Sequence, residues 1–296
     1  MKLTRTQFDA LVYLLDADAA NMSTALGCSA EEAAQIAEDL TRNNLVDRNM
    51  NVTELGLESL APYRTKRVIF LAAGFGSRLR PATINVPKPM VRVHGKPIIC
   101  YAIEAAIAAG IEEIYIVRGY LGECFEQISK KYPQVRLVDN PDYETCNNIS
   151  SAMQIRHLMQ NAYVSEADLL INNPAMFCKY HYTSNCLGVP VEKTDDWCVI
   201  SENGVAKQLV KGGENCHHLF SLYYLSAEDG AKLPAQLEEL FNSEGGHDMF
   251  WDIAPMNRFN AQCHIEVREC RFEDISEIDT YAELQALDSG YIIASN

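Results

Sequence analysis

The sequence is short of basic residues: 25 Lys and Arg stand against 40 Asp and Glu, and the formal net charge is −15. Such a charge repels the phosphates of nucleic acids and of anionic membranes unless a local basic patch overrides it. It repels an anionic small molecule in the same way. A nucleotide site in this chain must therefore gather its own Lys and Arg and use Mg²⁺.

The chain also lacks the patterns of zinc sites, membrane spans and secretion signals. Its ten cysteines include no CxxC pair, which argues against a zinc site. No apolar run approaches the roughly 20 residues of a membrane span. The start, MKLTRTQFDALVYLL, has no charged-then-apolar signal pattern. We therefore expect a cytoplasmic protein with reduced thiols and no membrane contact.

Residues 1–64 predict a small winged helix-turn-helix domain. Apolar residues recur at helical spacing over residues 8–15, and Ser29 followed by Glu32 has the pattern of a capping box before a further helix. A turn-like segment at residues 47–49 lies between two apolar pairs and predicts a short hairpin. Helices followed by a hairpin are the order of elements in a winged helix.

The charge of this domain argues against DNA binding. It has five basic residues against ten acidic ones, and its presumed recognition helix, residues 30–43, carries four acidic residues with Arg42 alone at its end. Duplex recognition normally begins with several basic groups at the phosphates. We favour a protein contact, such as a homodimer through this domain. A transcriptional regulator with a metabolite-sensing domain stays as an alternative from another functional class.

Residues 65–296 predict one α/β domain with a doubly wound, mostly parallel sheet, because strand and helix patterns alternate. Beyond residue 180 the segments become hairpin-like. The strands are expected at 68–72, 113–117, 135–138 and 163–164, the helices at 98–109, 122–132 and 149–158, and the hairpin segments at 187–192, 197–200, 205–209 and 219–224.

A glycine-containing loop follows the first of these strands, in the stretch LAAGFGSRLRPATINVPKP at residues 71–89. Glycine lets backbone N–H groups approach phosphate oxygens, and Arg78 and Lys88 add positive charge. No GK[ST] follows, so this is not a Walker A loop. The residues expected to contact a nucleotide here are Leu71, Ala72, Ala73, Gly74, Gly76 and Ser77.

The stretch resembles the signature loop of nucleotidyltransferases with a Rossmann-like fold. The resemblance implies a nucleotide-diphospho-sugar transferase-like domain. It also implies that Lys88 and Arg78 contact the triphosphate and stabilise charge on the α-phosphate.

Carboxylates are the ligands that Mg²⁺ needs beside a triphosphate. Asp168 ends an apolar strand, where ligands of such sheets bind. The segment Glu277-Ile278-Asp279-Thr280 resembles the late DID-T/EID-S segment of the same families. This resemblance implies Asp279 as the second metal ligand, with Glu277 beside it. Asp252 is the competing candidate.

The two tryptophans both lie next to acids, in Asp195-Asp196-Trp197 and in Phe250-Trp251-Asp252. A quaternary ammonium cannot donate hydrogen bonds, so aromatic faces and nearby negative charge hold it best. We expect Trp197, the second cluster and Glu277 to line an acceptor pocket, if the fold brings them together. Otherwise both tryptophans fill core or surface grooves.

Residues 65–296 resemble the bacterial CTP:phosphocholine cytidylyltransferases along nearly their whole length, through VRGYLGECFEQ, SEAD, DDW, FWD and EIDTYAEL. The resemblance implies that Asn147, Asn148 and Ser150 help to bind cytidine. It also implies transfer of a cytidylyl group from CTP to phosphocholine, with release of pyrophosphate. Phosphoethanolamine, an aminophosphonate or a sugar phosphate remain alternative acceptors, and the choice of cytidine rests on the resemblance alone.

Overall fold

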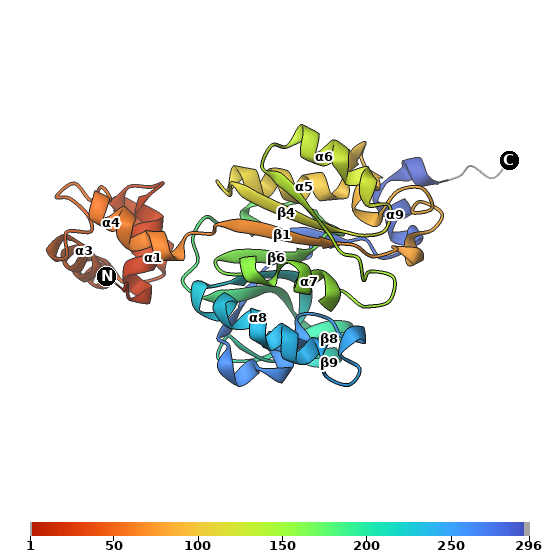
Figure 1. Cartoon of the computed structure of the whole chain (residues 1–296). Coiled ribbons are helices and arrows are strands. Elements are labelled where there is room, and N and C mark those ends of the chain that lie inside the picture. The colour runs from red at the N-terminus through yellow and green to blue at the C-terminus, as the bar shows by residue number, and fades with distance from the viewer. Residues whose placement is uncertain (1, 293–296) are drawn as a thin grey trace. The chain divides into compact units, whose positions relative to one another are not determined.

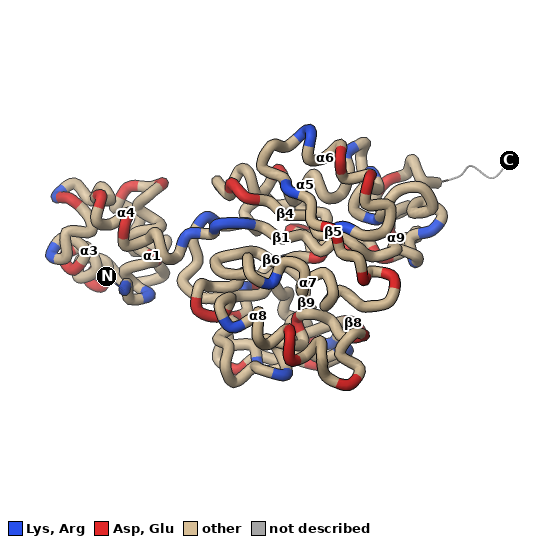
Figure 2. Tube along the Cα trace, in the orientation of Figure 1, with Lys and Arg blue, Asp and Glu red and all other residues tan. Residues whose placement is uncertain are grey.

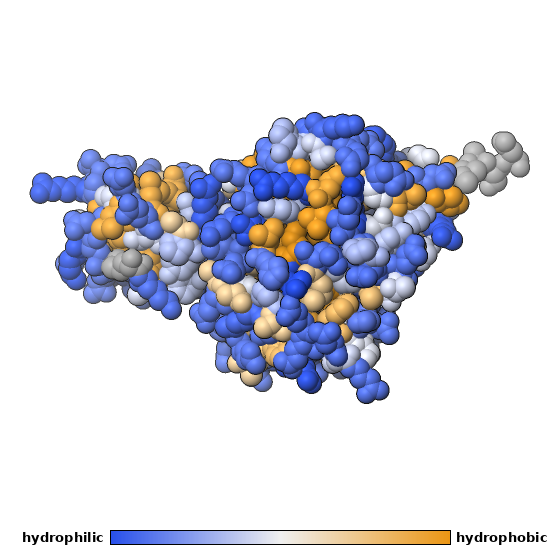
Figure 3. Space-filling model, viewed as in Figure 1, coloured by the Kyte–Doolittle hydropathy of each residue, from blue (hydrophilic) through white to orange (hydrophobic). Residues whose placement is uncertain are grey.

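The computed structural model describes residues 2–292, and these form two compact units. The first extends to Arg64 and includes Tyr180–Tyr182, and the second holds Thr65–Lys179 and the chain from Thr183 onward (Figure 1). None of the helices within the described range is long and apolar enough to cross a membrane. Mostly hydrophilic side chains cover the visible face of each unit, and smaller apolar areas lie among these side chains (Figure 3).

The regular elements described in the first unit are all helices, whereas helices and strands alternate through most of the second. The α-helices are α1 (Arg5–Leu14), α2 (Met22–Leu26), α3 (Ala30–Arg42), α4 (Glu54–Leu60), α5 (Ile98–Ala108), α6 (Glu126–Lys131), α7 (Ile149–Ile155), α8 (Ala227–Phe241) and α9 (Tyr281–Leu287). The β-strands are β1 (Arg67–Ala72), β2 (Arg92–Val93), β3 (Lys96–Pro97), β4 (Glu113–Arg118), β5 (Val135–Asp139), β6 (Ala162–Glu166), β7 (Leu169–Ile171), β8 (Ser184–Glu202), β9 (Val205–Leu225), β10 (Ile265–Glu269) and β11 (Ile275–Glu277).

The N-terminal unit packs α1 to α4 around a small apolar core of its own. The expected capping box is present: the Ser29 hydroxyl accepts the Glu32 N–H, and the Glu32 carboxylate accepts the Ser29 N–H. The hairpin is reduced to a single antiparallel bridge between Val46 and Val52. A helix that the sequence pattern did not predict, α4, follows this bridge.

Three residues from far along the chain complete this core. The Tyr182 ring lies 5.5 Å from both the Phe8 and the Tyr63 ring, and it is stacked on the latter. Its hydroxyl donates a hydrogen bond to the Leu3 carbonyl at 3.2 Å. The N-terminal unit therefore depends on a segment more than one hundred residues downstream of Arg64.

The second unit is built on a seven-stranded sheet with the order β10-β8-β9-β6-β1-β4-β5. Strands β6, β1, β4 and β5 run parallel to one another, and β10 runs parallel to β8. The pairs β6–β9 and β8–β9 are antiparallel. The expected mostly parallel α/β sheet is thus confirmed.

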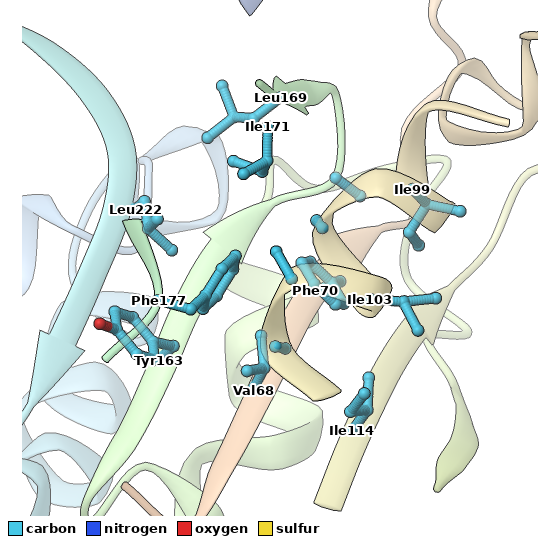
Figure 4. Packing of buried hydrophobic residues seen from close by; sticks show 14 of the residues in the cluster. Val68, Phe70, Ile99, Ile103, Ile114, Tyr163, Leu169, Ile171, Phe177 and Leu222 are labelled. Atoms are coloured by element: carbon cyan, nitrogen blue, oxygen red, sulfur yellow. The ribbon is translucent and has the colours of Figure 1, made fainter. Parts of the chain in front are cut away.

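Helices cover both faces of the sheet because alternate residues of β1 point to opposite sides. Val68 and Phe70 pack with α5 in one core, whereas Ile69 and Leu71 pack with α7 and α8 in the other. Figure 4 shows the first core, in which Phe70 lies near Ile103 of α5. Two-sided burial explains the uninterrupted apolar run of β1.

The hairpin-like segments beyond residue 180 are parts of two long strands, β8 of 19 residues and β9 of 21. Register shifts between Thr194 and Val199 interrupt their pairing. Such irregularities break the period-two pattern of a strand, which is why the sequence showed separate pieces.

The order of the strands fixes the position of the site. From β1 the chain adds β4 and β5 on one side and then returns to place β6 on the other side of β1. Ligands of open α/β sheets bind beyond the carboxyl ends of the strands at such a reversal. The loop after β1 and the residues after β6 meet there.

Gly230 of α8 offers a test of this packing. An added Cβ would press on the Met159 carbonyl oxygen and come within 2.7 Å of the Gln160 Cα, both of which are backbone atoms. We expect Gly230→Ala to lower the free energy of unfolding by about 1–3 kcal/mol, measured by urea titration. The exchange Ala231→Gly at the next, exposed helical position should cost no more than about 1 kcal/mol. A stabilised Gly230→Ala variant would contradict the packing described here.

Candidate active site

A cavity of about 540 Å³ opens at the carboxyl edge of β1 and β6. It is bounded by the loop after β1, the segment between β5 and α7, and the end of β6. Its lining residues are Leu71, Ala72, Ala73, Gly74, Phe75, Gly76, Arg78, Lys88, Pro89, Asn140, Tyr143, Glu144, Thr145, Cys146, Asn147, Asn148, Ser150, Ser151, Glu166, Ala167, Asp168, Asp248 and Phe250. Of the residues predicted for the nucleotide, Ser77 alone does not line it.

Gly76 sets the path of the loop after β1. Its φ is +58°, and an added Cβ would come within 2.9 Å of the Lys88 Cβ. A side chain here would therefore strain the backbone and displace Lys88. The Thr83 hydroxyl donates a hydrogen bond to the Gly76 carbonyl at 2.8 Å and ties the loop to itself.

The two predicted cationic side chains meet two of the predicted metal carboxylates. Lys88 Nζ donates to Asp168 Oδ2 and to Asp279 Oδ1, each at 2.7 Å. Arg78 forms a bidentate pair with Asp279, at 2.9 and 3.0 Å. The Lys88 side chain is 11% exposed and that of Arg78 is 70% exposed, so Arg78 can turn toward a ligand in the cavity at little cost.

These contacts set the charge states of the pair. Burial opposes the charge of Lys88, but the carboxylates of Asp168 and Asp279 outweigh it and hold the pKa of Lys88 above its usual value. Burial alone would raise the pKa of Asp279, yet the Lys88 and Arg78 cations lower it. Both partners are therefore charged near neutral pH.

Asp168, Glu277 and Asp279 form a carboxylate triad whose nearest oxygens all lie within 4.8 Å of one another. Strand pairing brings them together, because Glu277 of β11 pairs with Leu169 of β7, the residue after Asp168. Asp168 Oδ1 is buried and has no hydrogen-bond partner among residues 2–292. Three oxygen donors with one unsatisfied lone pair fit a hard divalent cation.

Two acids at this point titrate abnormally. Burial, aided by the charges of Asp168 and Asp279, raises the pKa of Glu277 to about 9. Burial and the charge of Asp168 raise the pKa of Glu166 to about 8. Both shifts come first from burial and then from neighbouring carboxylates, and a bound cation would lower both pKa values.

Asn147 and Asn148 stand on the cavity wall that faces the loop. Asn148 Nδ2 donates to Glu166 Oε1 at 2.9 Å, and Asn148 Oδ1 accepts the Trp251 N–H at 2.9 Å. Asn147 Nδ2 donates to the Asp248 carbonyl at 3.0 Å. The Ser150 hydroxyl donates to the Asn147 carbonyl, which fixes the first turn of α7.

The structure separates the residues predicted for the acceptor. Trp251 is 1% exposed and packs edge-on against Tyr223, whose hydroxyl donates to the buried carboxylate of Asp252 at 2.8 Å. Neither of these two predicted residues lines the cavity, because both face the core. Phe250 does line it, and Trp197 packs on Phe250 with ring centroids 5.5 Å apart.

Some lining residues escaped the prediction from sequence. Asn140 donates to the Ser150 and Ser151 hydroxyls at 2.9 and 3.0 Å and shapes the cavity floor. Glu166 is the last residue of β6 and lies two residues before the predicted ligand Asp168, and this nearness was an available signal. Tyr143 packs its ring 5.6 Å from that of Phe75, a contact between distant loops with no pattern in the sequence.

Comparison with known proteins places this geometry in a family. A family model described as "Nucleotidyl transferase" matches residues 67–186. The 2-aminoethylphosphonate cytidylyltransferase of Lancefieldella rimae is 33% identical over 228 residues, which cover 76% of this chain and 92% of that protein.

The chain belongs to the nucleotidyltransferase family.

Two further comparisons involve Streptococcus pneumoniae. Its choline-phosphate cytidylyltransferase is 31% identical to this nucleotidyltransferase over 225 residues, 75% of this chain and 96% of that one. A solved structure of a CTP:phosphocholine cytidylyltransferase from the same species has a TM-score of 0.71 and 30% identity. It covers 77% of this chain and 100% of that one.

The raised pKa of Glu277 would make binding of a divalent cation at the triad depend on pH. Near pH 7 the Glu277 carboxyl is protonated, and it must lose its proton to act as a ligand. We therefore expect Mg²⁺ titrated into the protein at about pH 7 to release roughly one proton per ion. Calorimetry in two buffers of different ionisation enthalpy measures this number.

The variant Glu277→Gln provides the comparison. It should bind Mg²⁺ more weakly and release fewer protons, whereas Glu273→Gln, at an exposed position near β11, should behave as the unaltered chain does. Equal proton release from the unaltered and the Glu277→Gln proteins would show that Glu277 is not a ligand of the cation.

Proposed function

We propose that this nucleotidyltransferase moves a cytidylyl group from CTP to the phosphate or phosphonate of a small amine and releases pyrophosphate. Phosphocholine is the first candidate for this acceptor. The observation that carries the proposal is the meeting of Arg78 and Lys88 with the carboxylate triad at the open carboxyl edge of β1 and β6. Cations beside such carboxylates suit a triphosphate that is bound together with a divalent cation.

The reaction needs no nucleophile from the protein. An oxygen of the acceptor phosphate, already anionic, attacks the α-phosphorus of CTP, and the bond from that phosphorus to the bridging oxygen of pyrophosphate breaks. Catalysis then consists of positioning and charge stabilisation. In our assignment Lys88 and Arg78 hold the α-phosphate region, and the loop at residues 71–77 cradles the phosphates with its backbone.

Asp168 and Asp279 are the proposed ligands of Mg²⁺, with Glu277 beside them. Asp168 and Asp252 each have a buried carboxylate oxygen with no hydrogen-bond partner among residues 2–292. Asp168 lines the cavity and Asp252 does not, which speaks against that competitor. The ion, when bound, would neutralise negative charge on the phosphates. Release of Lys88 from one carboxylate would free its ammonium for the nucleotide.

The cytidine base is assigned to the wall formed by Asn147, Asn148 and Ser150. All three residues line the cavity. A side-chain amide has two N–H donors, and the bonds of Asn147 to Asp248 and of Asn148 to Glu166 use one donor each, so a second donor is left for a base edge. The two relatives described above are cytidylyltransferases, which supports CTP over other nucleotides.

The comparisons suggest two acceptors, phosphocholine and 2-aminoethylphosphonate. One relative is named for each compound, and the two relatives have similar sequence identity to this chain. Both carry a positive nitrogen close to an anionic phosphorus group. Of the residues predicted for the acceptor, Glu277 lies at the triad and stays our candidate for an acceptor contact. Phe250, with Trp197 packed on it, lines the cavity that we assign to the nucleotide. We assign Trp251 and Asp252 instead to supporting roles in the core.

We also infer that residues 1–64 form a winged helix-turn-helix domain that contacts protein rather than DNA, a second copy of the chain being our first candidate. Ten free cysteines support a reducing, cytoplasmic setting for the reaction.

The first experiment measures pyrophosphate release from CTP, UTP and dTTP, each with phosphocholine, phosphoethanolamine, 2-aminoethylphosphonate and a sugar phosphate. We expect CTP with one of the amine acceptors to give the fastest release. No release with any pair in the presence of Mg²⁺ would refute the proposal.

The second experiment removes one cation. Arg78→Ala should lower kcat by about 100-fold or more, because an aligned charge at the reacting phosphate is lost. Its unfolding temperature should hardly change, since the side chain is mostly exposed. Arg80→Ala is the matched control: Arg80 lies in the same loop and is exposed, but it does not line the cavity. Equal losses in the two variants would refute the role of Arg78.

A further inference from the structure

A second cavity, of about 270 Å³, lies on the other side of the carboxylate triad. The β8–β9 hairpin forms one wall, with Asp196 and His218. The segment from Phe272 through β11 to α9 forms the other wall, with Glu277 and Glu283.

The two cavities meet at the triad. Asp168 lines the first cavity, whereas Glu277 and Asp279 line the second, and their carboxylate oxygens lie within 4.8 Å of one another. A group that reaches the triad from the second cavity therefore arrives next to whatever is bound in the first. A two-substrate transfer requires this arrangement, because the acceptor phosphate must approach the nucleotide without displacing it.

The charge of the second cavity is opposite to that of an anion site. Four carboxylates, those of Asp196, Glu277, Asp279 and Glu283, line it, and none of the described residues that line it is Lys or Arg. The first cavity, in contrast, contains both Arg78 and Lys88. Figure 2 shows how widely acidic residues are spread along the chain. Of the four acids here, Asp279 is paired with Arg78 and Lys88 of the first cavity. The negative charge that faces the second cavity therefore comes chiefly from Asp196 and Glu283.

Three aromatic rings form the apolar side of the second cavity. The Phe272 ring lies 5.3 Å from the His218 ring and 6.2 Å from the Phe220 ring, and the rings of His218 and Phe220 are 5.4 Å apart. Phe272 is 55% exposed, an unusual position for a ring that packs on two others. An aromatic face next to carboxylates is the environment that a desolvated organic cation prefers.

His218 does not counter this preference. Burial lowers the pKa of its imidazole, against the weaker opposing effect of the Asp196 carboxylate. The ring is therefore neutral at pH 7 and offers a face without a competing charge.

We propose that this second cavity holds the positively charged nitrogen of the acceptor, with Phe272 as the aromatic contact and Asp196 as the carboxylate that sets its preference for a cation. The inference rests on the proposed cytidylyl transfer and adds where the acceptor lies and what selects it. The acceptor phosphate points to the triad, and its ammonium points away from the nucleotide.

The test compares phosphocholine with 3,3-dimethylbutyl phosphate, in which a carbon replaces the nitrogen and the charge is lost at nearly the same shape. 2-Aminoethylphosphonate and its neutral analogue propylphosphonate form a second pair, for a chain that prefers the primary amine. The unaltered protein should favour the charged member of the pair it uses by about 10-fold or more in kcat/KM.

Two variants address the pocket. Asp196→Asn removes the charge but keeps a side-chain oxygen. That oxygen can still accept the hydrogen bond that the backbone N–H of Trp197 donates to Asp196 Oδ1 at 2.7 Å. Phe272→Leu keeps an apolar side chain but removes the aromatic face. Each should raise the KM for the charged acceptor by about 5- to 20-fold and leave the KM for CTP and the rate with the neutral analogue nearly unchanged.

Neighbouring exposed acids outside the cavity supply the controls. Asp195→Asn and Glu273→Gln alter the net charge by the same amount as Asp196→Asn does, yet neither residue lines the cavity. They should leave the charged-to-neutral preference intact. If Asp196→Asn and Phe272→Leu also leave it intact while transfer proceeds, the pocket assignment is wrong and the proposed function stands. If no cytidylyl transfer occurs with any acceptor, the proposed function itself fails.

Discussion

Lys88 joins parts of the C-terminal unit that are far apart in sequence. Its ammonium lies between Asp168, which follows β6, and Asp279, which follows β11, while Lys88 itself comes from the loop after β1. Without this cation, two carboxylates in a partly buried setting would repel each other. The ion pairs thus hold the central sheet, the small β7–β11 sheet and the loop in one arrangement. Both cavities are defined by that arrangement.

The same contacts explain how a chain with a net charge of −15 can attract an anion. Positive charge is concentrated at Arg78 and Lys88, where carboxylates hold it in place until a competing anion arrives. Further acids lie nearby at Glu166 and Glu277, and burial together with the neighbouring carboxylates raises the pKa of both. Attraction for a triphosphate, for a divalent cation and for an organic cation can then coexist within one small region.

Local patterns predicted the parts of this site that are made of consecutive residues. The apolar run of β1, the glycine loop and the position of Asp168 at a strand end follow from strand and loop chemistry, and the structure places them together. The meeting of Asp279 with Lys88 depends on β11 pairing with β7 across about one hundred residues, which only family resemblance anticipated. Trp251 shows the limit most clearly. An acid beside a tryptophan looks alike in sequence whether the ring faces a ligand or, as here, the core.

The return of Tyr180–Tyr182 to the N-terminal unit affects how the protein is made. A domain at the start of a chain usually folds while the rest is still being synthesised. Here the Tyr182 ring, which stacks on Tyr63, leaves the ribosome only after most of the parallel strands have emerged. The N-terminal core stays incomplete through that interval. A shortened protein that begins at Thr65 would keep Tyr182 but lose the Phe8 and Tyr63 rings that pack against it. The Tyr182 ring would then be exposed to water, and a polar residue at position 182 would avoid this exposure of apolar surface.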